Sequence, residues 1–382
     1  MTAELLVDTV KDGFRYYSSI SGDVWHPADD APGSYEWWYF DAISDDGRDA
    51  LVIIFLADFV FSPRFNRAVV KHRWKQRRAP RPAEFPAVSV CLYRDGRLRF
   101  RANSEYTAAD FSAGRDQPFC RIGRSEFRLA ETPQGCSYDV TIDEHLRGGR
   151  RVKASLSWAV TDGDFASRDA GGTHADANAP GNSDGHQWNM VAPRCRVEGI
   201  INLFERNGAR VDERHFCGAG YHDHNRDRRW LPATVAAWQW GRAHFKDQTT
   251  AVFYRYRENA DEMPTTRLFV VRGGELADYD AQLKTQRVRR HHFGVRYPRS
   301  LEFMAEAESK TISLIFSQRR VIEGSYFYLR FLADVVLDIG DGRTQRAQAI
   351  TEHLAPRALH WRWLDWLTNM RIGRNGRSSF LK

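Results

Sequence analysis

The sequence lacks the features that mark disulfide-bonded, secreted and membrane-spanning proteins. Its five cysteines are odd in number and include no CxxC pair, which argues against a disulfide framework or a zinc knuckle and fits a reducing compartment. No stretch reaches the roughly 20 apolar residues that span a bilayer. The N-terminus has no basic segment followed by an apolar run. We therefore expect a cytoplasmic protein, with a peripheral position at the inner face of the membrane as the alternative.

Helical periodicity is also scarce, whereas aromatic residues are abundant. The 12 Trp, 14 Tyr and 23 Phe favour half-buried strand faces and pockets for flat, apolar ligands. Segments rich in β-branched and aromatic residues, such as Leu51–Phe61, Val88–Tyr93 and Thr250–Tyr256, alternate with turn signals such as Asp95-Gly96 and Asn207-Gly208. This pattern predicts an all-β protein built of sandwiches or barrels.

The length, 382 residues, is about right for two domains of roughly 100–200 residues each. We expect β domains over residues 25–230 and 231–350, followed by an amphipathic helix and basic tail over 356–382. The helix, between Pro356 and Met370, either packs its tryptophan face onto a barrel or lies at a membrane interface. Its face consists of residues at helical spacing: Leu359, Trp363, Trp366, Leu367 and Met370.

Two polar segments stand out from this pattern. Gly163–Gly185 has almost no apolar residues and predicts a mobile surface loop, with His174 and His186 as polar loop residues. Between Asp58 and Glu84 there is no acidic residue, but there are eight basic ones: Arg64, Arg67, Lys71, Arg73, Lys75, Arg77, Arg78 and Arg81. Such a cluster is either a solvated loop or a surface for an anionic partner. Because the sequence has no nucleic-acid reading motif, we expect no nucleic-acid partner.

The first unusual block is the aromatic run Tyr35–Asp41. In a strand, Trp37 and Tyr39 project to one face and Trp38 and Phe40 to the other, so both faces must be covered. A core strand explains this pattern, and a substrate-binding strand is the alternative.

Asp58 interrupts the apolar run Leu51–Phe61. Its carboxyl group is therefore expected in a dry environment, where it must be paired, hydrogen-bonded or protonated. Carboxyl groups of this kind are candidates for a functional site, although structural ones also occur.

The second block spans Cys217–Asn225. In a strand, Tyr221, Asp223 and Asn225 share one face, and both histidines, His222 and His224, lie on the other. A carboxylic acid can donate a proton, an amide can orient it and a phenol can relay it. The two histidines could bind zinc or iron, but no third ligand stands at a fixed spacing, so we expect no metal.

The third block, Trp238–His244, places Trp238 and Trp240 on one strand face. The two indoles either belong to the core or form an aromatic wall that stabilises a carbocation, because the face of an aromatic ring attracts positive charge.

The order of the blocks EWWYFD, SDDG, FSP, GYHDHN and WQWGRAH resembles the carotenoid 1,2-hydratase (hydroxyneurosporene synthase) family. Kievitone-hydratase-like proteins and fungal Diels–Alderases look similar over the same blocks. The resemblance implies two lipocalin-like β-barrel or sandwich domains with a site at or near their junction. It further implies a lyase that needs no metal or organic cofactor: an acid protonates an alkene and water captures the resulting cation.

Carried over residue by residue, the resemblance gives Asp223 as the acid, with Tyr221 and Asn225 beside it. The expected substrate-binding residues are Trp37, Tyr39, Asp58, His222, Trp238 and Trp240. The expected partner is an apolar isoprenoid or polyene. The alternatives are a cyclase that folds a polyene intermediate and a lipocalin-like carrier without catalytic activity.

Overall fold

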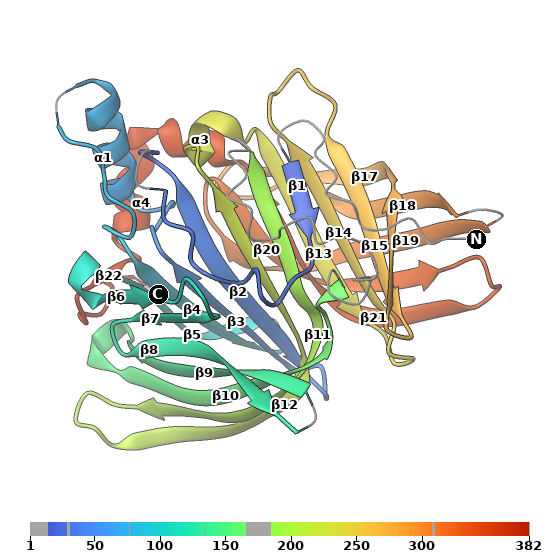
Figure 1. Ribbon diagram of the computed structural model, residues 1–382, viewed down its shortest axis with the longest axis horizontal. Coiled ribbons are helices and arrows are strands. Elements are labelled where there is room, and N and C mark those ends of the chain that lie inside the picture. Colours follow the sequence, from blue (N-terminus) through green and yellow to red (C-terminus); the bar gives the residue numbers. More distant parts are fainter. Residues whose placement is uncertain are drawn as a thin grey trace. The chain divides into compact units, whose positions relative to one another are not determined.

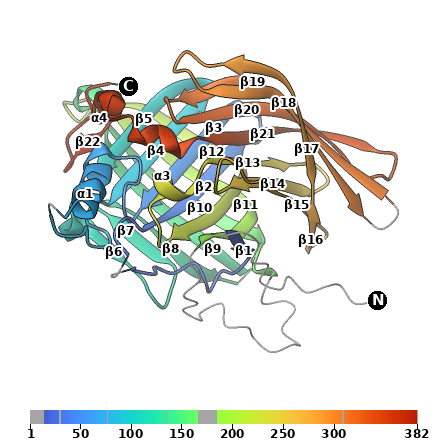
Figure 2. The ribbon, with the colours of Figure 1, turned by 90° about the horizontal axis from the view of Figure 1, so that it is seen from above.

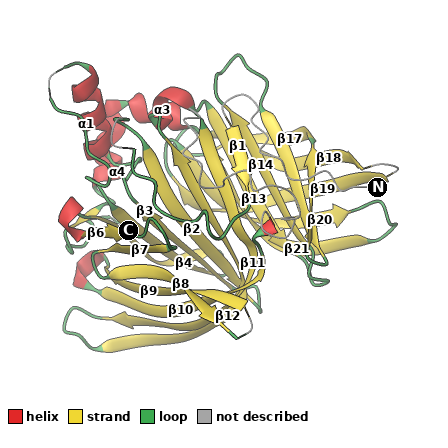
Figure 3. Cartoon of the chain, in the orientation of Figure 1, coloured by secondary structure: helices red, strands yellow, loops and turns green. Residues whose placement is uncertain are grey.

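The computed structural model describes residues 14–28, 31–75, 77–133, 135–165, 185–307 and 310–381. Most of the predicted loop Gly163–Gly185, including His174, lies outside these residues. Strands dominate the fold (Figure 3), which confirms the all-β prediction. The chain divides into two compact units, residues 1–231 with 361–382 (unit 1) and residues 232–360 (unit 2).

Unit 1 contains a 13-stranded sheet in the order β22-β5-β4-β3-β2-β12-β11-β10-β9-β8-β7-β6, with β1 pairing with β11. Its neighbours are antiparallel except for the pairs β1–β11 and β22–β5, which are parallel. The strands are β1 Phe14–Tyr17, β2 Tyr35–Ser44, β3 Asp49–Leu56, β4 Ala87–Arg94, β5 Arg97–Glu105, β6 Phe111–Ala113, β7 Phe119–Ile122, β8 Ser125–Thr132, β9 Gly135–His145, β10 Arg151–Asp162, β11 His186–Phe204, β12 Arg210–Asp227 and β22 Gly373–Arg374. Single 3-10 turns cover Ala108–Asp110 and Arg147–Gly149.

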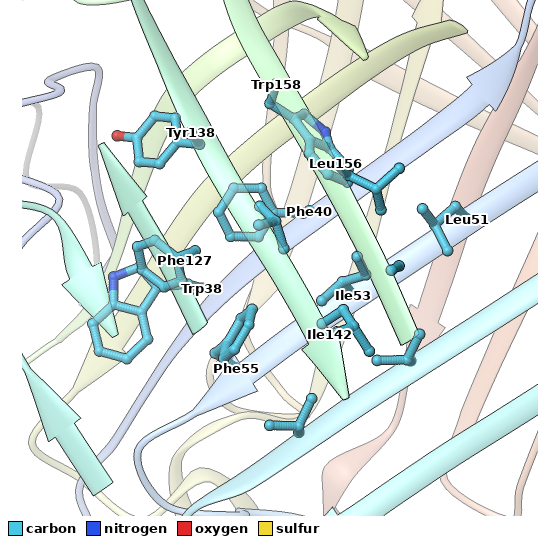
Figure 4. Close-up of a cluster of buried hydrophobic side chains, with 14 of the residues drawn as sticks. Trp38, Phe40, Leu51, Ile53, Phe55, Phe127, Tyr138, Ile142, Leu156 and Trp158 are labelled. Carbon is cyan, nitrogen blue, oxygen red and sulfur yellow. The ribbon is translucent and has the colours of Figure 1, made fainter. Parts of the chain in front are cut away.

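The core of unit 1 lies against one face of this curled sheet (Figure 4). Alternate residues of β2, among them Trp38 and Phe40, point into it, as the period of two predicts. The Phe40 ring packs edge to face against Trp158 of β10 at 5.5 Å and lies 5.2 Å from Phe127 of β8. The same alternation directs Trp37 and Tyr39 to the opposite face.

A glycine lets β12 pass closely over this core. A Cβ atom on Gly220 would stand 2.4 Å from Val197 Cγ2 and 2.7 Å from Trp158 Nε1. No larger residue fits there without moving the buried indole.

Unit 2 contains a nine-stranded antiparallel sheet in the order β16-β15-β14-β13-β21-β20-β19-β18-β17. Its core includes Phe253, Phe303 and Phe316, whose rings lie 4.4–6.0 Å apart. The strands are β13 Ala237–His244, β14 Thr250–Arg257, β15 Thr265–Arg272, β16 Glu275–Asp280, β17 Gln282–Arg290, β18 Arg296–Ala307, β19 Lys310–Gly324, β20 Tyr328–Asp338 and β21 Thr344–Leu354. The four-residue helix α3, Leu231–Thr234, stands at the boundary between the units.

The predicted C-terminal helix is present but much shorter than expected. In place of one helix over Pro356–Met370, the chain forms 3-10 turns at Pro356–His360 and Arg362–Leu364 and a helix, α4, at Asp365–Asn369. Trp363 and Trp366 are 73% and 56% exposed, so of the two alternatives the one in which they pack onto a barrel is wrong. The buried residues here are Leu359, Leu364 and Asp365. A helix this short is set by such tertiary contacts rather than by periodicity.

One helix was not anticipated by the sequence pattern. Helix α1, Pro63–Arg73, begins after Ser62, whose side chain accepts a hydrogen bond from the Arg64 backbone, and it has proline at its first position. The Ser62-Pro63 pair is the sequence signal that could have revealed it. Figures 1 and 2 both show α1 beside α4. None of the helices in the described ranges is long and apolar enough to cross a membrane.

Candidate active site

Strand β12 separates two sets of polar side chains because successive residues point to opposite faces. It lies between β2 and β11, with Tyr221 opposite Asp41, Asp223 opposite Tyr39, and Asn225 opposite both Trp37 and Trp188. We call the face that carries these seven residues the acid face. The opposite face carries His222, His224 and Glu36, and we call it the histidine face.

Asp223 is the centre of the acid face. Its Oδ2 accepts hydrogen bonds from Trp188 Nε1 at 2.9 Å and the Tyr221 hydroxyl at 2.8 Å, and its Oδ1 accepts one from Asn225 Nδ2 at 2.8 Å. The side chain is buried, with 4% of its surface exposed. Burial opposes a charge on Asp223, whereas the three donors favour its carboxylate form. The structure thus brings Tyr221, Asp223 and Asn225 together.

Trp188 was missed by the sequence analysis. It lies on β11, 35 positions from Asp223, and nothing in a single sequence shows which two strands pair. The HQWN segment around it directly follows the polar stretch, where we expected loop residues. His186, predicted as a loop residue, instead opens β11 and is fully buried, so that prediction is wrong.

Asp41 is a second buried carboxyl group on the acid face. It has no exposed surface, and its Oδ2 accepts a hydrogen bond from the Tyr39 hydroxyl at 2.9 Å. In the β2–β12 register, Asp41 and Asp223 occupy diagonal positions, because each lies opposite the tyrosine that neighbours the other. Diagonal neighbours on one face lie roughly 7–8 Å apart. Asp41 ends the aromatic run Tyr35–Asp41, but the sequence pattern predicted no role for it.

Aromatic rings extend the acid face beyond the two carboxyl groups. Trp37 stacks on Tyr35 at 4.9 Å, and His186 stacks on Phe14 at 5.9 Å. The Tyr35 hydroxyl lies 2.9 Å from His186 Nδ1. Burial lowers the pKa of His186 to about 3, so its ring is neutral at physiological pH. This end of the face therefore combines aromatic rings and a neutral imidazole, beside the ion pair of Asp227 and Arg229.

The histidine face carries a buried network of opposite charges. His222 places Nε2 2.9 Å from Asp23 Oδ2, and His224 places Nε2 2.8 Å from Glu36 Oε1 and Nδ1 3.3 Å from Asp23 Oδ1. Burial alone lowers the pKa of His224, but hydrogen bonds to Asp23 and Glu36 outweigh it and raise the pKa to about 9. Against the effect of burial, His224 and His26 lower the pKa of Glu36 to about 2. The two carboxylates, Asp23 and Glu36, thus hold His224 between them as a cation.

The same region contains the group of side chains in the described ranges that could hold a metal ion. Ligand atoms of His26, Glu36 and His224 lie within 4.8 Å of one another. Both nitrogens of His224 already face carboxylate oxygens, Nε2 that of Glu36 and Nδ1 that of Asp23. These contacts favour a network of histidines and carboxylates over a metal centre, and the expected absence of a metal stays a prediction.

His222 was predicted to contact substrate. Its ring is fully buried, stacks on Phe40 at 3.8 Å and places Nδ1 3.0 Å from the Tyr39 carbonyl oxygen. These contacts favour a structural role beneath Tyr39, and the substrate contact remains untested.

Asp58 is buried, as expected, and accepts backbone hydrogen bonds from Ala83 at 2.9 Å and Phe85 at 3.0 Å. Burial raises its pKa to about 8 despite these bonds. Asp58 lines a cavity of about 340 Å³ together with residues that include His26 and Glu36, and none of Tyr221, Asp223 and Asn225 lines that cavity. The structure thus associates Asp58 with the histidine face.

Trp238 and Trp240 lie on β13 of unit 2 and are 8% and 2% exposed. Both occupy the same face of the strand, as predicted, and Trp238 stacks on Tyr254 at 5.4 Å. Their role toward a substrate stays a prediction.

The protein consists of two lipocalin-like β units. One of them contains a buried acid that accepts hydrogen bonds from indole, phenol and amide donors. The family model of the carotenoid hydratases (CrtC) matches residues 52–381. The chain therefore belongs to this family. The resemblance inferred from the motifs is confirmed, as is the prediction of an enzyme related to hydro-lyases.

Individual relatives agree with this assignment. The chain is 27% identical over 366 residues to the hydroxyneurosporene dehydrogenase of Chlorobaculum tepidum. The alignment covers 93% of this chain and 91% of that protein. It is 31% identical over 236 residues to the acyclic carotenoid 1,2-hydratase of Rubrivivax gelatinosus. This alignment covers 60% of this chain and 50% of the relative. The chain thus spans about half the length of that hydratase. The crystal structure of CghA with Sch210972 shares the fold, with a TM-score of 0.54 and 13% identity over 85% of this chain and 89% of CghA.

Proposed function

We propose that the protein adds water to a carbon–carbon double bond of an acyclic, carotenoid-like isoprenoid by acid catalysis and without a cofactor. The observation that carries the proposal is Asp223, a buried acid with three hydrogen-bond donors in a member of the carotenoid hydratase family. The similarity to acyclic carotenoid 1,2-hydratases supports the choice of substrate class.

In the first step Asp223, in its protonated form, gives its proton to one carbon of the double bond, and the other carbon becomes a tertiary cation. A normal aspartate is almost entirely ionised at neutral pH, so the acid needs its buried environment to stay protonated at rest. A second carboxyl group, Asp41, on the same face adds to this effect, because two neighbouring carboxyl groups resist ionising together. Trp188, Tyr221 and Asn225 then stabilise the carboxylate as the proton leaves.

In the second step water adds to the cation, and its proton must go to a base. We assign this role to Asp41, which lies diagonally across from Asp223 on the same face. The O–H bond of water breaks, the C–O bond forms and Asp41 holds the proton. Its return to Asp223 completes the addition of one water and restores the enzyme. Tyr39 and Tyr221, hydrogen-bonded to Asp41 and Asp223, lie along the route.

The cation must be shielded from water until a water molecule is positioned to add to it. Trp37 and Tyr39 supply aromatic surface on the acid face, and a cation–π contact contributes on the order of 1–2 kcal/mol. The predicted contribution of Trp238 and Trp240 is of the same kind. Because an acyclic carotenoid dissolves in membranes, the proposal includes a peripheral position at the inner membrane face.

The test is a product assay in water labelled with ¹⁸O. Purified protein is incubated with an acyclic carotenoid in detergent micelles. The products are separated, and their masses are measured by mass spectrometry. We expect a product heavier than the substrate by one labelled water. A product of unchanged mass would favour the cyclase alternative, and loss of two hydrogens would favour a dehydrogenase like the Chlorobaculum relative. Tight binding without any product would favour a carrier.

A further inference from the structure

All four exposed tryptophans of the protein lie on two segments of unit 1. Of the 12 tryptophans, Trp74, Trp361, Trp363 and Trp366 are 74%, 51%, 73% and 56% exposed, and the other eight are buried or half-buried. Folded proteins rarely leave several large aromatic side chains in water on one region unless the region binds something. These segments are α1 with the residues that follow it, and the chain from Trp361 to Trp366.

The two segments, almost 300 residues apart in sequence, lie side by side (Figures 1 and 2). Arg67 of α1 joins Asp365 of α4 through an ion pair of 2.8 Å. Arg67, Lys71 and Trp74 occupy positions i, i+4 and i+7, which form one stripe along a helix. This stripe starts at the ion pair, and Asp365 adjoins Trp366 in sequence. The two segments that carry the exposed tryptophans are therefore joined at this ion pair.

The C-terminal segment is anchored and does not lie loosely on the surface. Leu364, Asp365 and Ile372 are 8%, 6% and 6% exposed, so they tie it to unit 1. Helix α1 is anchored in the same way by Phe65, Asn66 and Val69. The tryptophans are thus turned outward by a fixed backbone.

The region is also basic. Lys71, Lys75 and Arg362 are exposed and form no ion pair with any residue in the described ranges. The single acid of the C-terminal segment, Asp365, is already paired with Arg67. Tryptophan and basic residues together are typical of surfaces that sit at the headgroup level of an anionic bilayer.

We propose that the tryptophan–basic surface, formed by Lys71, Trp74, Lys75, Trp361, Arg362, Trp363 and Trp366, docks the protein onto an anionic lipid bilayer. The proposal rests on the proposed function, because an enzyme for a membrane-dissolved isoprenoid must collect its substrate there. The tryptophans enter the headgroup region and the basic side chains attract the lipid phosphates. Nucleic acid would bind the basic side chains but would leave the four outward-facing indole rings without a function.

The experiment is vesicle flotation of the full chain at low and physiological salt. The vesicles consist of phosphatidylcholine alone or of phosphatidylcholine with phosphatidylglycerol. We expect binding to the anionic vesicles that weakens with salt, since screening shortens to about 8 Å at physiological ionic strength. Lipids brominated near the headgroups should quench part of the tryptophan fluorescence. A wild-type protein that stays unbound with anionic vesicles at low salt overturns the proposal.

Two variants test the two components of the surface. Lys71→Glu/Lys75→Glu should weaken binding by about tenfold or more, because each basic residue near an anionic surface contributes about 1 kcal/mol. Trp363→Ser/Trp366→Ser should weaken binding and remove much of the quenching. The matched controls are Lys284→Glu/Arg289→Glu and Met263→Ser, whose positions are exposed on unit 2. Equal losses in variants and controls contradict the proposal.

Two further readouts separate this inference from its alternatives. With substrate in detergent micelles the surface variants should turn over at the wild-type rate, and with substrate in vesicles they should slow. Slow turnover in both media would mean a folding defect and overturn the surface assignment, while leaving the hydration chemistry intact. If the charge variant loses binding to duplex DNA and the tryptophan variant keeps full vesicle binding, the surface binds nucleic acid and the proposal is wrong.

Discussion

The two faces of β12 both hold buried carboxyl groups but give them different partners. On the histidine face, Asp23 and Glu36 lie against His222 and His224, and they hold His224 as a cation within the core. On the acid face, the donors to Asp223 described above are neutral. Cationic partners hold a carboxylate in its ionised form, whereas neutral donors stabilise it without preventing protonation. One strand thus combines a stabilising network with a carboxyl group that can exchange a proton.

The largest expected effect concerns the histidine face. His224→Gln removes the cation that lies between Asp23 and Glu36, while His222 and His26 still contact these two carboxylates. Breaking a buried pair in this way costs roughly 3–5 kcal/mol of unfolding free energy. Denaturant unfolding measures the loss. His215→Gln, on an exposed position of the same strand, is the control and should be nearly neutral.

The pH dependence of unfolding sharpens this prediction. The pKa of His224 is raised from 6.5 to about 9 in the folded state, so its contribution is complete below pH 6.5 and is lost as the pH rises through 9. The pKa of Glu36 is lowered from 4.5 to about 2, so its contribution is present above pH 4.5 and is lost as the pH falls through 2. A wild-type stability that does not fall between pH 7 and 10 would contradict the network.

The next effect concerns Asp223. Asp223→Asn retains an oxygen that accepts from Trp188 and Tyr221, and the Asn225 amide can turn to face the new amino group, so the shape survives. Removal of the acid should lower turnover at least about 100-fold, the usual share of general acid catalysis, while unfolding changes little. Asp139→Asn, on an exposed position, is the control. A variant with near wild-type turnover removes Asp223 from the mechanism and directs attention to Asp58.

A smaller effect is expected for Asp41→Asn, which still accepts the hydrogen bond from Tyr39. If Asp41 takes the proton of water, hydration should fall about tenfold or more. The cation still forms and then loses a proton, so the substrate recovered from D₂O should gain deuterium. Asp223→Asn should abolish both hydration and deuterium uptake. The reverse pattern, with uptake lost only in Asp41→Asn, would exchange the two roles.

Much of the acid face could be predicted from the sequence because strand alternation is local. The period of two placed Tyr221, Asp223 and Asn225 together and separated them from His222 and His224 before any partner strand was known. The burial of Asp58 followed equally from its apolar neighbours. These inferences need only the conformation of one segment.

The remaining parts of the site depend on pairing between distant strands, which one sequence does not determine. Trp188 reaches Asp223 across the β11–β12 pair, and Asp41 faces Tyr221 across β2–β12. The C-terminal helix was predicted too long for a related reason. Its apolar period fits a single helix, but the contacts of Leu364 and Asp365 with unit 1 decided which side chains are buried.

Asp58 offers a finer test of the comparison, because its pKa of about 8 exceeds the usual 3.8. The folded protein then holds this proton more tightly than the unfolded chain. The unfolding free energy should therefore fall as the pH rises from about 4 to 8, by at most about 1.4 kcal/mol per pH unit. Asp58→Asn should remove the contribution of Asp58 to this slope, whatever constant offset the altered contacts with Ala83 and Phe85 add. The contribution of Glu144, whose pKa burial raises to about 7, should remain. A slope as steep in the variant as in the wild type contradicts a protonated Asp58.

The smallest expected effect is that of chelation, which tests whether the histidine face is a charge network at all. His26, Glu36 and His224 have the residue types and spacing of a metal centre. If His224 is a cation paired with Asp23 and Glu36, exhaustive dialysis against a chelator should change neither turnover nor the melting temperature. Elemental analysis of untreated protein should find less than one zinc or iron per chain. One equivalent of metal that is lost in His26→Ala would overturn the charge-balance argument. The histidine face would then be a metal site, and the hydration scheme would have to be reconsidered around it.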